Sequence, residues 1–360
     1  MRHTVFMLRV QVAIFTIVFV IAGLLQWHIW DGRWSVDDSL WKEAAESHAT
    51  FSPIGPEHGI YGYPAMTILV PAGALIREGV PPMEALSLVM RFSIAVAIAL
   101  TAVAAYAARL RTLWWAFVAF MLAVFPFYIA ATAPVALSIP LVCLFLILTL
   151  TAYERPHARN YLLLGLCGGI LLATRFEIAA ILLGSAILLL RFSSGRSLAF
   201  FIPVIASFIT FTALDPVFLA NPWMHLTGIA GKIFEHAEGQ IRNDGAFLDI
   251  FLRAPYAGLA AFALGVALLA LRKLRTLPAR FILWYALAST IMLTALSFSV
   301  YHPVWILFPI IVPWTMFLPF FAYDAYRSLR LPHYVSPEFI AVVCAIIFGA
   351  YYLFDFLVLW

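Results

Sequence analysis

The sequence predicts an all-α fold: a polytopic membrane bundle of about eleven transmembrane helices. Hydrophobic residues make up 64% of the 360 residues and charged residues only 11%, whereas about half of a soluble globular chain is apolar. The mean hydropathy is +0.98. Apolar residues occur in runs of about twenty, the length that an α-helix needs to cross a hydrocarbon core of roughly 30 Å. These runs do not alternate with polar residues as the strands of a membrane barrel would.

Charged residues separate the apolar runs and delimit the predicted helices to within a few residues. Arg2 and Arg9 precede the first run, which we interpret as an uncleaved signal anchor. The stretch 61–76 is apolar but short and contains prolines, so we expect a helix that dips into the membrane or lies on its surface. The predicted spans are residues 8–30, 86–108, 113–130, 134–153, 160–174, 176–191, 198–214, 254–271, 281–298, 303–325 and 338–359.

The arginines between spans predict the topology. If 61–76 does not cross, all these clusters fall on one side, which the positive-inside rule assigns to the cytoplasm. Most acids then collect on the outer face. We therefore expect one membrane domain, residues 1–360, in a bacterial plasma (inner) membrane, with a cytoplasmic N-terminus. The clusters are Arg2 and Arg9, Arg109 and Arg111, Arg155 and Arg159, Arg191 and Arg196, Arg272 to Arg280, and Arg327 and Arg330.

Two long connections, residues 31–84 and 215–253, lie outside in this topology, which suggests a site at the outer face. The cytoplasmic connections are short, and neither GxxxxGK[ST] nor GxGxxG occurs, so we do not expect nucleotide binding. The net charge of +4 is explained by orientation in the membrane. Membrane lipids are therefore expected partners and nucleic acid is not.

The first outer loop contains an adjacent acidic pair, Asp37 and Asp38, at the start of a short amphipathic run. Leu40, Trp41, Ala44 and Ala45 fall on one helical face, and Lys42, Glu43 and Glu46 mostly on the other. We expect this run to lie along the membrane surface. One carboxylate could accept a proton from an acceptor hydroxyl while the other orients it or holds a divalent cation. The alternative for Asp38 is a structural N-cap.

Four further polar residues are candidates for binding a phosphate. Arg91 lies near the outer end of the second span, where an ionisable group is costly and usually functional. Arg175 could bind phosphate with its fork of donors, or pair with Glu177, or reach the headgroups. His58 either contacts a substrate phosphate or faces water, and His302 either contacts a lipid phosphate or only marks a helix boundary. No HExxH pattern joins the histidines, so we expect no zinc site.

The loop sequence resembles the GT-C class of integral-membrane glycosyltransferases, in particular the protein O-mannosyltransferases and the aminoarabinose transferases. Their first outer loop carries W-x-x-D-E-[ST]-x-Y-x-E, and this chain has Trp34, Asp37, Asp38, Ser39, Trp41 and Glu43 at that spacing. The end of the loop, EHGIYGYP with His58 and Tyr61, is similar to the family's [EK]-P or H-P-P element followed by aromatics. Thr174 and Arg175 match a T-[RK] dipeptide between two short helices.

The resemblance implies transfer of one sugar from a polyprenyl-phosphate donor to a lipid, glycan or protein acceptor at the outer face, with inversion. It implies Asp37 as general base, Asp38 as its helper, and Arg175, His58, Arg91, Tyr61 and His302 around the donor phosphate. Ser138 stands where some relatives carry a second acid, which leaves the use of a metal at Asp37 and Asp38 open.

Two other functions remain open on the sequence. A transporter or flippase for lipid-linked saccharides would need polar residues near the midplane or interrupted helices in matching halves. A non-catalytic assembly factor descended from such a transferase would explain the missing second acid.

Overall fold

In the computed structural model we describe residues 2–29, 37–50, 69–107, 133–174, 182, 185–186, 189–190 and 196–214. All secondary structure in this part of the chain is α-helical, with no strand, and it therefore has the predicted all-α character. Its helices are α1 (Arg2–Ile29), α2 (Asp37–Thr50), α4 (Val70–Arg77), α5 (Pro82–Ala107), α8 (Ala133–Glu154), α9 (Ala158–Thr174) and α11 (Arg196–Leu214).

Five predicted apolar runs coincide with long helices. The runs 8–30, 86–108, 134–153, 160–174 and 198–214 correspond to α1, α5, α8, α9 and α11. Of the ambiguous stretch 61–76, only its last part is described, and it belongs to α4, an eight-residue helix. Such a helix is about 12 Å long and too short to cross a bilayer. The run 176–191 is described at isolated helical positions only. The runs 113–130, 254–271, 281–298, 303–325 and 338–359 lie outside the described residues.

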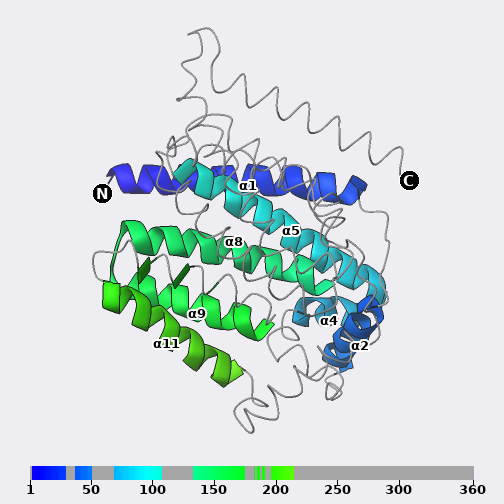
Figure 1. The fold of residues 1–360 in the computed structure, drawn as a ribbon. Coiled ribbons are helices and arrows are strands. Elements are labelled where there is room, and N and C mark those ends of the chain that lie inside the picture. Colours follow the sequence, from blue (N-terminus) through cyan, green and yellow to red (C-terminus); the bar gives the residue numbers. More distant parts are fainter. Residues whose placement is uncertain are drawn as a thin grey trace, which may run out of the picture.

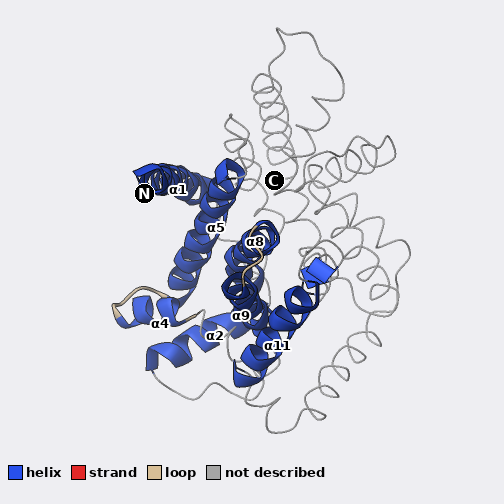
Figure 2. Cartoon of the chain, turned by 90° about the vertical axis from the view of Figure 1, so that its left-hand side faces the viewer, coloured by secondary structure: helices blue, strands red, loops and turns tan. Residues whose placement is uncertain are grey.

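The long helices run side by side with defined directions (Figure 1). Helix α5 runs antiparallel to α1 and contacts it along its length, with Phe19 and Phe92 in an edge-on ring contact of 5.3 Å between centroids. Helix α8 runs parallel to α5, α9 returns along α8, and α11 runs parallel to α9. Seen from the side, α8 and α9 occupy the middle, between α1 with α5 and α11 (Figure 2).

These directions separate the charges of the described residues. We call the end where α1, α9 and α11 begin and α8 ends the basic end. It carries Arg2, Arg9, Arg155, Arg159 and Arg196, with Glu154 as its acid. The opposite acidic end, formed by α2, α4 and the start of α5, carries Asp37, Asp38, Glu43, Glu46, Glu78 and Glu84, with Lys42 and Arg77 as its cations.

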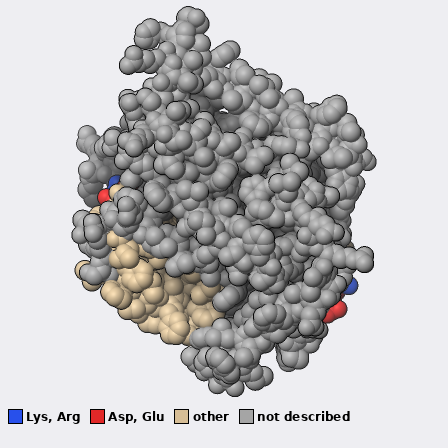
Figure 3. Space-filling view, in the orientation of Figure 1, with Lys and Arg blue, Asp and Glu red and all other residues tan. Residues whose placement is uncertain are grey.

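One helix in the described part is long and apolar enough to cross a membrane, over Pro82–Leu100 of α5, and half of that window is buried. Shorter apolar segments occupy Arg9–Leu24, Pro140–Glu154, Ala158–Leu172 and Leu198–Ala213. Large apolar side chains are exposed along one face of α11, where Phe201, Phe208 and Ile209 are more than half exposed. In Figure 3 the described surface over this region carries no charged side chain, and charges appear at the two edges. An exposed apolar surface of this kind is typical of a face that contacts a membrane or another protein.

Helices α9 and α11 approach closely because three positions of α9 are glycine. A Cβ added at Gly165 would lie 2.7 Å from the carbonyl oxygen of Pro203, and one at Gly168 would lie 2.7 Å from Ser207 Oγ. A Cβ at Gly169 would lie 2.6 Å from the carbonyl oxygen of Ser207. Ser207 Oγ also donates a hydrogen bond of 3.0 Å to the carbonyl of Gly165. Small residues four apart and hydroxyl bonds between helices are the packing devices of membrane helices.

The connections next to the long helices are short and well specified. Helix α4 ends in a Schellman motif: Gly79 has φ of 92° and donates to Ile76, while Val80 donates to Leu75. Proline is the first residue of α5. It is well suited to this position because the first N–H groups of a helix have no acceptor within the helix, so no hydrogen bond is lost. Between α8 and α9 only residues 155–157 intervene, and Asn160 Nδ2 closes this turn on the carbonyl of Arg155 at 2.8 Å.

The glycine packing gives a matched test. Gly169→Ala places a methyl group against Thr210 and Ser207, whereas Gly23→Ala in α1 meets no atom within 4 Å. Alanine favours a helix over glycine by about 0.5–1 kcal/mol, and overpacking costs about 1–3 kcal/mol. We expect Gly169→Ala to lower the thermal midpoint of the detergent-solubilised protein and Gly23→Ala to leave or raise it. Equal midpoints for the two variants would contradict the close α9–α11 contact.

Candidate functional site

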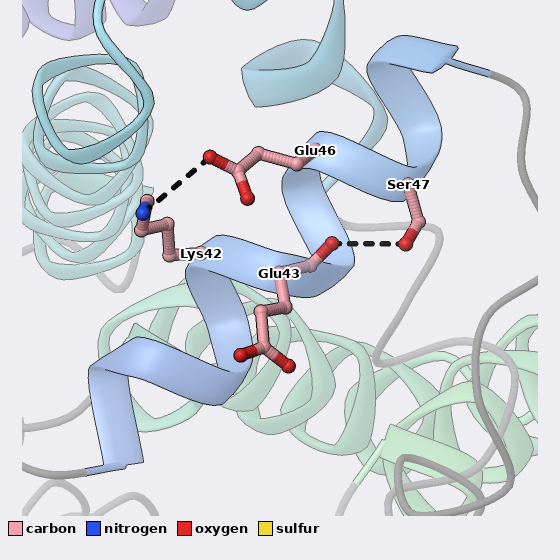
Figure 4. Close-up of polar contacts among 4 residues, drawn as sticks. All are labelled: Lys42, Glu43, Glu46 and Ser47. Atoms are coloured by element: carbon pink, nitrogen blue, oxygen red, sulfur yellow. Dashed lines mark hydrogen bonds and ion pairs between the residues drawn. The ribbon is translucent and has the colours of Figure 1, made fainter.

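Helix α2 is amphipathic in the predicted sense. Ala44 and Ala45 are fully buried and Ala49 nearly so, while Glu43 is exposed. On the outer side, Lys42 Nζ lies 3.6 Å from Glu46 Oε1, and Ser47 Oγ donates to the carbonyl of Glu43 at 2.9 Å (Figure 4). The ion pair is about 40% exposed at both partners and contributes little, about 0.3–0.5 kcal/mol. Burial of the alanine face therefore holds α2 in place.

The face of α2 packs against α4 with almost no space between the backbones. A Cβ added at Gly73 would lie 2.7 Å from His48 Cβ and 3.0 Å from the amide nitrogen of Ala49. One turn further along α4, Arg77 Nη1 donates to the carbonyl of His48 at 2.9 Å. That carbonyl is in the last turn of α2, where carbonyls lack helical partners and attract cations. We call Gly73, Arg77 and His48 the clasp.

The first turn of α2 contains both acids, since the helix begins at Asp37. Carboxylates are stabilised there by the partial positive charge of the helix N-terminus, typically by 0.3–1 kcal/mol. At about 100° per residue, Asp37 is in register with Ala44 and His48, and Asp38 with Ala45 and Ala49. The acids thus occupy positions on the packed face of α2, while Glu43 belongs to its exposed face. The side chains of Asp37 and Asp38 lie outside the described ones.

Arg91 is the predicted phosphate-binding residue that the structure describes in full. It is half-buried in the third turn of α5, within the apolar window Pro82–Leu100. It shares one stripe of α5 with the buried Ser87 and the exposed Glu84, which is two turns, about 10 Å, closer to the start of the helix. Helix α5 contacts α2 and α4. Arg91 is therefore a cation inside the helices, on the half of α5 nearer the acidic end.

The other predicted residues, Arg175, His58, Tyr61 and His302, lie outside the described residues. The last residue of α9 is Thr174, and α9 ends away from the basic end (Figure 1). Arg175 is the next residue in the sequence after the last residue of α9.

Sequence reasoning missed the clasp. Arg77 and His48 are 29 positions apart, and neither belongs to the motif that drew attention to the loop. A signal was present in VPAGALIR, where Gly73 and Arg77 are four residues apart and therefore share one face of a helix.

The described residues contain no group of three or more His, Cys, Asp or Glu side chains that could hold a metal ion. The divalent cation at Asp37 and Asp38 stays a prediction, because these carboxylates are not among the described side chains.

Comparison with known proteins adds no relative. No protein-family model matches the chain, and no curated protein matches it in sequence. The residues and their placement are therefore the starting point for a functional proposal.

The packed face of α2 can be tested with one substitution at two positions. Ala45→Gln puts a polar side chain at a fully buried position, whereas Glu43→Gln changes an exposed residue. Overpacking and an imperfectly paired buried amide together cost about 1–3 kcal/mol. We expect deuterium exchange in peptides covering residues 37–50 to accelerate about tenfold or more for Ala45→Gln and to stay at the wild-type rate for Glu43→Gln. Similar exchange in both variants would mean that α2 is not held by its alanine face.

Proposed function

We propose that this chain is an integral-membrane glycosyltransferase of the GT-C type, built on a bundle of about eleven transmembrane helices. It transfers one sugar from a polyprenyl-phosphate donor to a lipid, glycan or protein acceptor at the extracytoplasmic face. The proposal combines the loop motif with the arrangement of the helices around it.

The observation that carries the proposal is the position of the acidic turn of α2. This turn belongs to the acidic end of the described helices, and its two acids are in register with the buried Ala44 and Ala45 instead of the exposed Glu43. A catalytic carboxylate needs a fixed position, and a helix packed on its neighbours provides one more firmly than a free loop. Surface acids that serve only solubility would be expected on the exposed face of α2.

In the proposed reaction, the Asp37 carboxylate takes the proton of the acceptor hydroxyl. The hydroxyl oxygen then forms a bond to the anomeric carbon while the bond from that carbon to the carrier phosphate oxygen breaks. The phosphate leaves with the bonding electrons, and the anomeric configuration inverts. Asp38 orients the base or the acceptor, and a divalent cation held by the two acids would belong to the same site.

Cations are needed where the departing phosphate gains charge. Arg91 supports this role because it lies inside the apolar part of α5 and on the half nearer the acidic end. We assign Arg175, His58, Tyr61 and His302 to the same phosphate on the basis of the family resemblance.

The charge separation supports an orientation in the membrane. The described basic end carries five arginines, Arg2, Arg9, Arg155, Arg159 and Arg196, and the cytoplasmic side of a membrane protein is the side enriched in arginine and lysine. The acidic end then faces outward, in a bacterial inner membrane, together with the site.

A transporter or flippase is the second candidate, and two features favour it. Arg91 places a charge within an apolar helix, and α8 and α11 contain Pro140 and Pro203 in their interiors. Polar groups at depth and helices weakened by proline are typical of transport paths. Movement of a labelled lipid-linked sugar across vesicles without chemical change would favour this function over transfer.

The chemistry is tested with purified protein, a panel of polyprenyl-phosphate sugars and mass spectrometry of the products. We expect Asp37→Asn to lower the transfer rate at least about 100-fold, the usual contribution of a general base, with an unchanged amount of folded protein in the membrane. Glu46→Gln, which changes an acid of the same helix that lies outside the motif and is 39% exposed, is the control and should retain activity. Full activity of Asp37→Asn would remove the base assignment.

The orientation is tested by thiol labelling of intact cells with a reagent that does not cross membranes. Glu43 and Arg159 are both exposed and belong to opposite ends of the described helices. We expect Glu43→Cys to react in intact spheroplasts and Arg159→Cys only after permeabilisation, with the parent chain as background. Reaction of both from the same side would contradict the proposed topology.

A further inference from the structure

We propose that the clasp residues Gly73 and Arg77 are positioning residues for the acidic turn of α2. This inference rests on the proposed function, because positioning matters only if Asp37 and Asp38 react. It adds two residues of α4 that do not touch the reacting atoms in our scheme but determine where the acids stand.

The first step is geometric. Gly73 and Arg77 contact α2 at His48, which is eleven residues after Asp37. At 1.5 Å per residue, the acidic turn therefore lies about 16 Å from this contact. Over this length, a rotation of about 4° about this contact moves the acidic turn by roughly 1 Å. A displacement of 1 Å at a reacting group can cost about 100-fold in rate. The orientation of α2 therefore has to be held within a few degrees.

The second step concerns what holds that orientation. Gly73 leaves space for direct contact with His48 and Ala49, and any Cβ at this position would have to displace the backbone of α2. Arg77 Nη1 fixes the same turn of α2 through the His48 carbonyl at 2.9 Å. One contact limits how far α2 can approach α4, and the other limits how far it can move away. Together they fix the separation of the two helices at the last turn of α2, and the contacts of α2 with α5 and α8 then limit its tilt about that turn.

The third step is the anchoring of α4 itself. The Schellman motif at Gly79 closes α4, and α5 begins at Pro82, so only four residues separate the clasp helix from a long helix of the bundle. Leu69 and Ala72 of the α4 segment are fully buried. Helix α4, which contacts α2, is thus held in place by α5, the same helix that carries Arg91. The positions of the two acids and of Arg91 therefore both depend on α5.

The test combines a distance and a rate. The native cysteines are first replaced by alanine. Spin labels are then attached at Ser39→Cys, which is in register with the exposed Glu43, and at Glu84→Cys, which is exposed at the start of α5. The distance between the two labels reports the orientation of α2 relative to α5. We expect Gly73→Ala and Arg77→Ala to shift the distance between the labels by about 2 Å or to broaden its distribution. Arg77→Lys keeps a hydrogen-bond donor and should give a distance close to that of the parent chain. Gly23→Ala and Arg159→Ala are the matched controls and should leave it unchanged.

In the transfer assay with a polyprenyl-phosphate hexose, the same clasp variants should lower kcat about 10- to 100-fold while KM for the donor stays within about twofold, since the reacting geometry and not donor binding is altered. Unchanged label distances in both variants, or changed distances with wild-type kcat, would overturn the positioning role while the transferase proposal stands. Absence of transfer by the wild type, with distances that still change, would instead overturn the proposed function and leave the clasp as a structural contact only.

Discussion

The contact between Gly73 and His48 is the constraint on which the arrangement of the acidic end depends. Helix α2 is only fourteen residues long and mostly polar on its outer side, and isolated helices of that length are marginal in water. The alanine face of α2 buries little apolar area, so the helix is stabilised mainly by very close packing against its neighbours. Glycine on α4 makes that approach possible, and the arginine one turn later supplies a bond to a carbonyl that the helix itself leaves unsatisfied.

The same device occurs at larger scale between α9 and α11. There the glycines are on the long apolar helix α9, and the partner contributes Ala206, Ser207 and Thr210. In both places the molecule relies on backbone proximity in addition to interlocking large side chains. Close backbone contact at glycine is typical of helix pairs in membranes, where lipid chains solvate leucine as well as another helix does and contact distance decides which helices associate. The α9–α11 contact therefore fits the proposed membrane bundle.

Within the described residues, the sequence predicted the long helices well and the local contacts poorly, for physical reasons. Apolar runs report burial, so they located α5 and α8, but helices extend into polar turns that hydropathy does not register. This is why α5 begins at Pro82, four residues before the predicted start. The amphipathic pattern of α2 was confirmed at Ala44, Ala45 and Glu43. The clasp was not predictable from periodicity, since Arg77 and His48 meet through tertiary folding across 29 positions.

The turn between α8 and α9 has a consequence for folding. Only three residues, 155–157, join two helices of 22 and 17 residues, and the turn is fastened by the Asn160 side chain. Closing a loop of three residues costs little chain entropy, so the contacts between α8 and α9 belong to the local contacts that form fastest as the chain folds. The two helices then meet α11 as a hairpin, and the glycines of α9 contact α11 from a helix that is already fixed against α8.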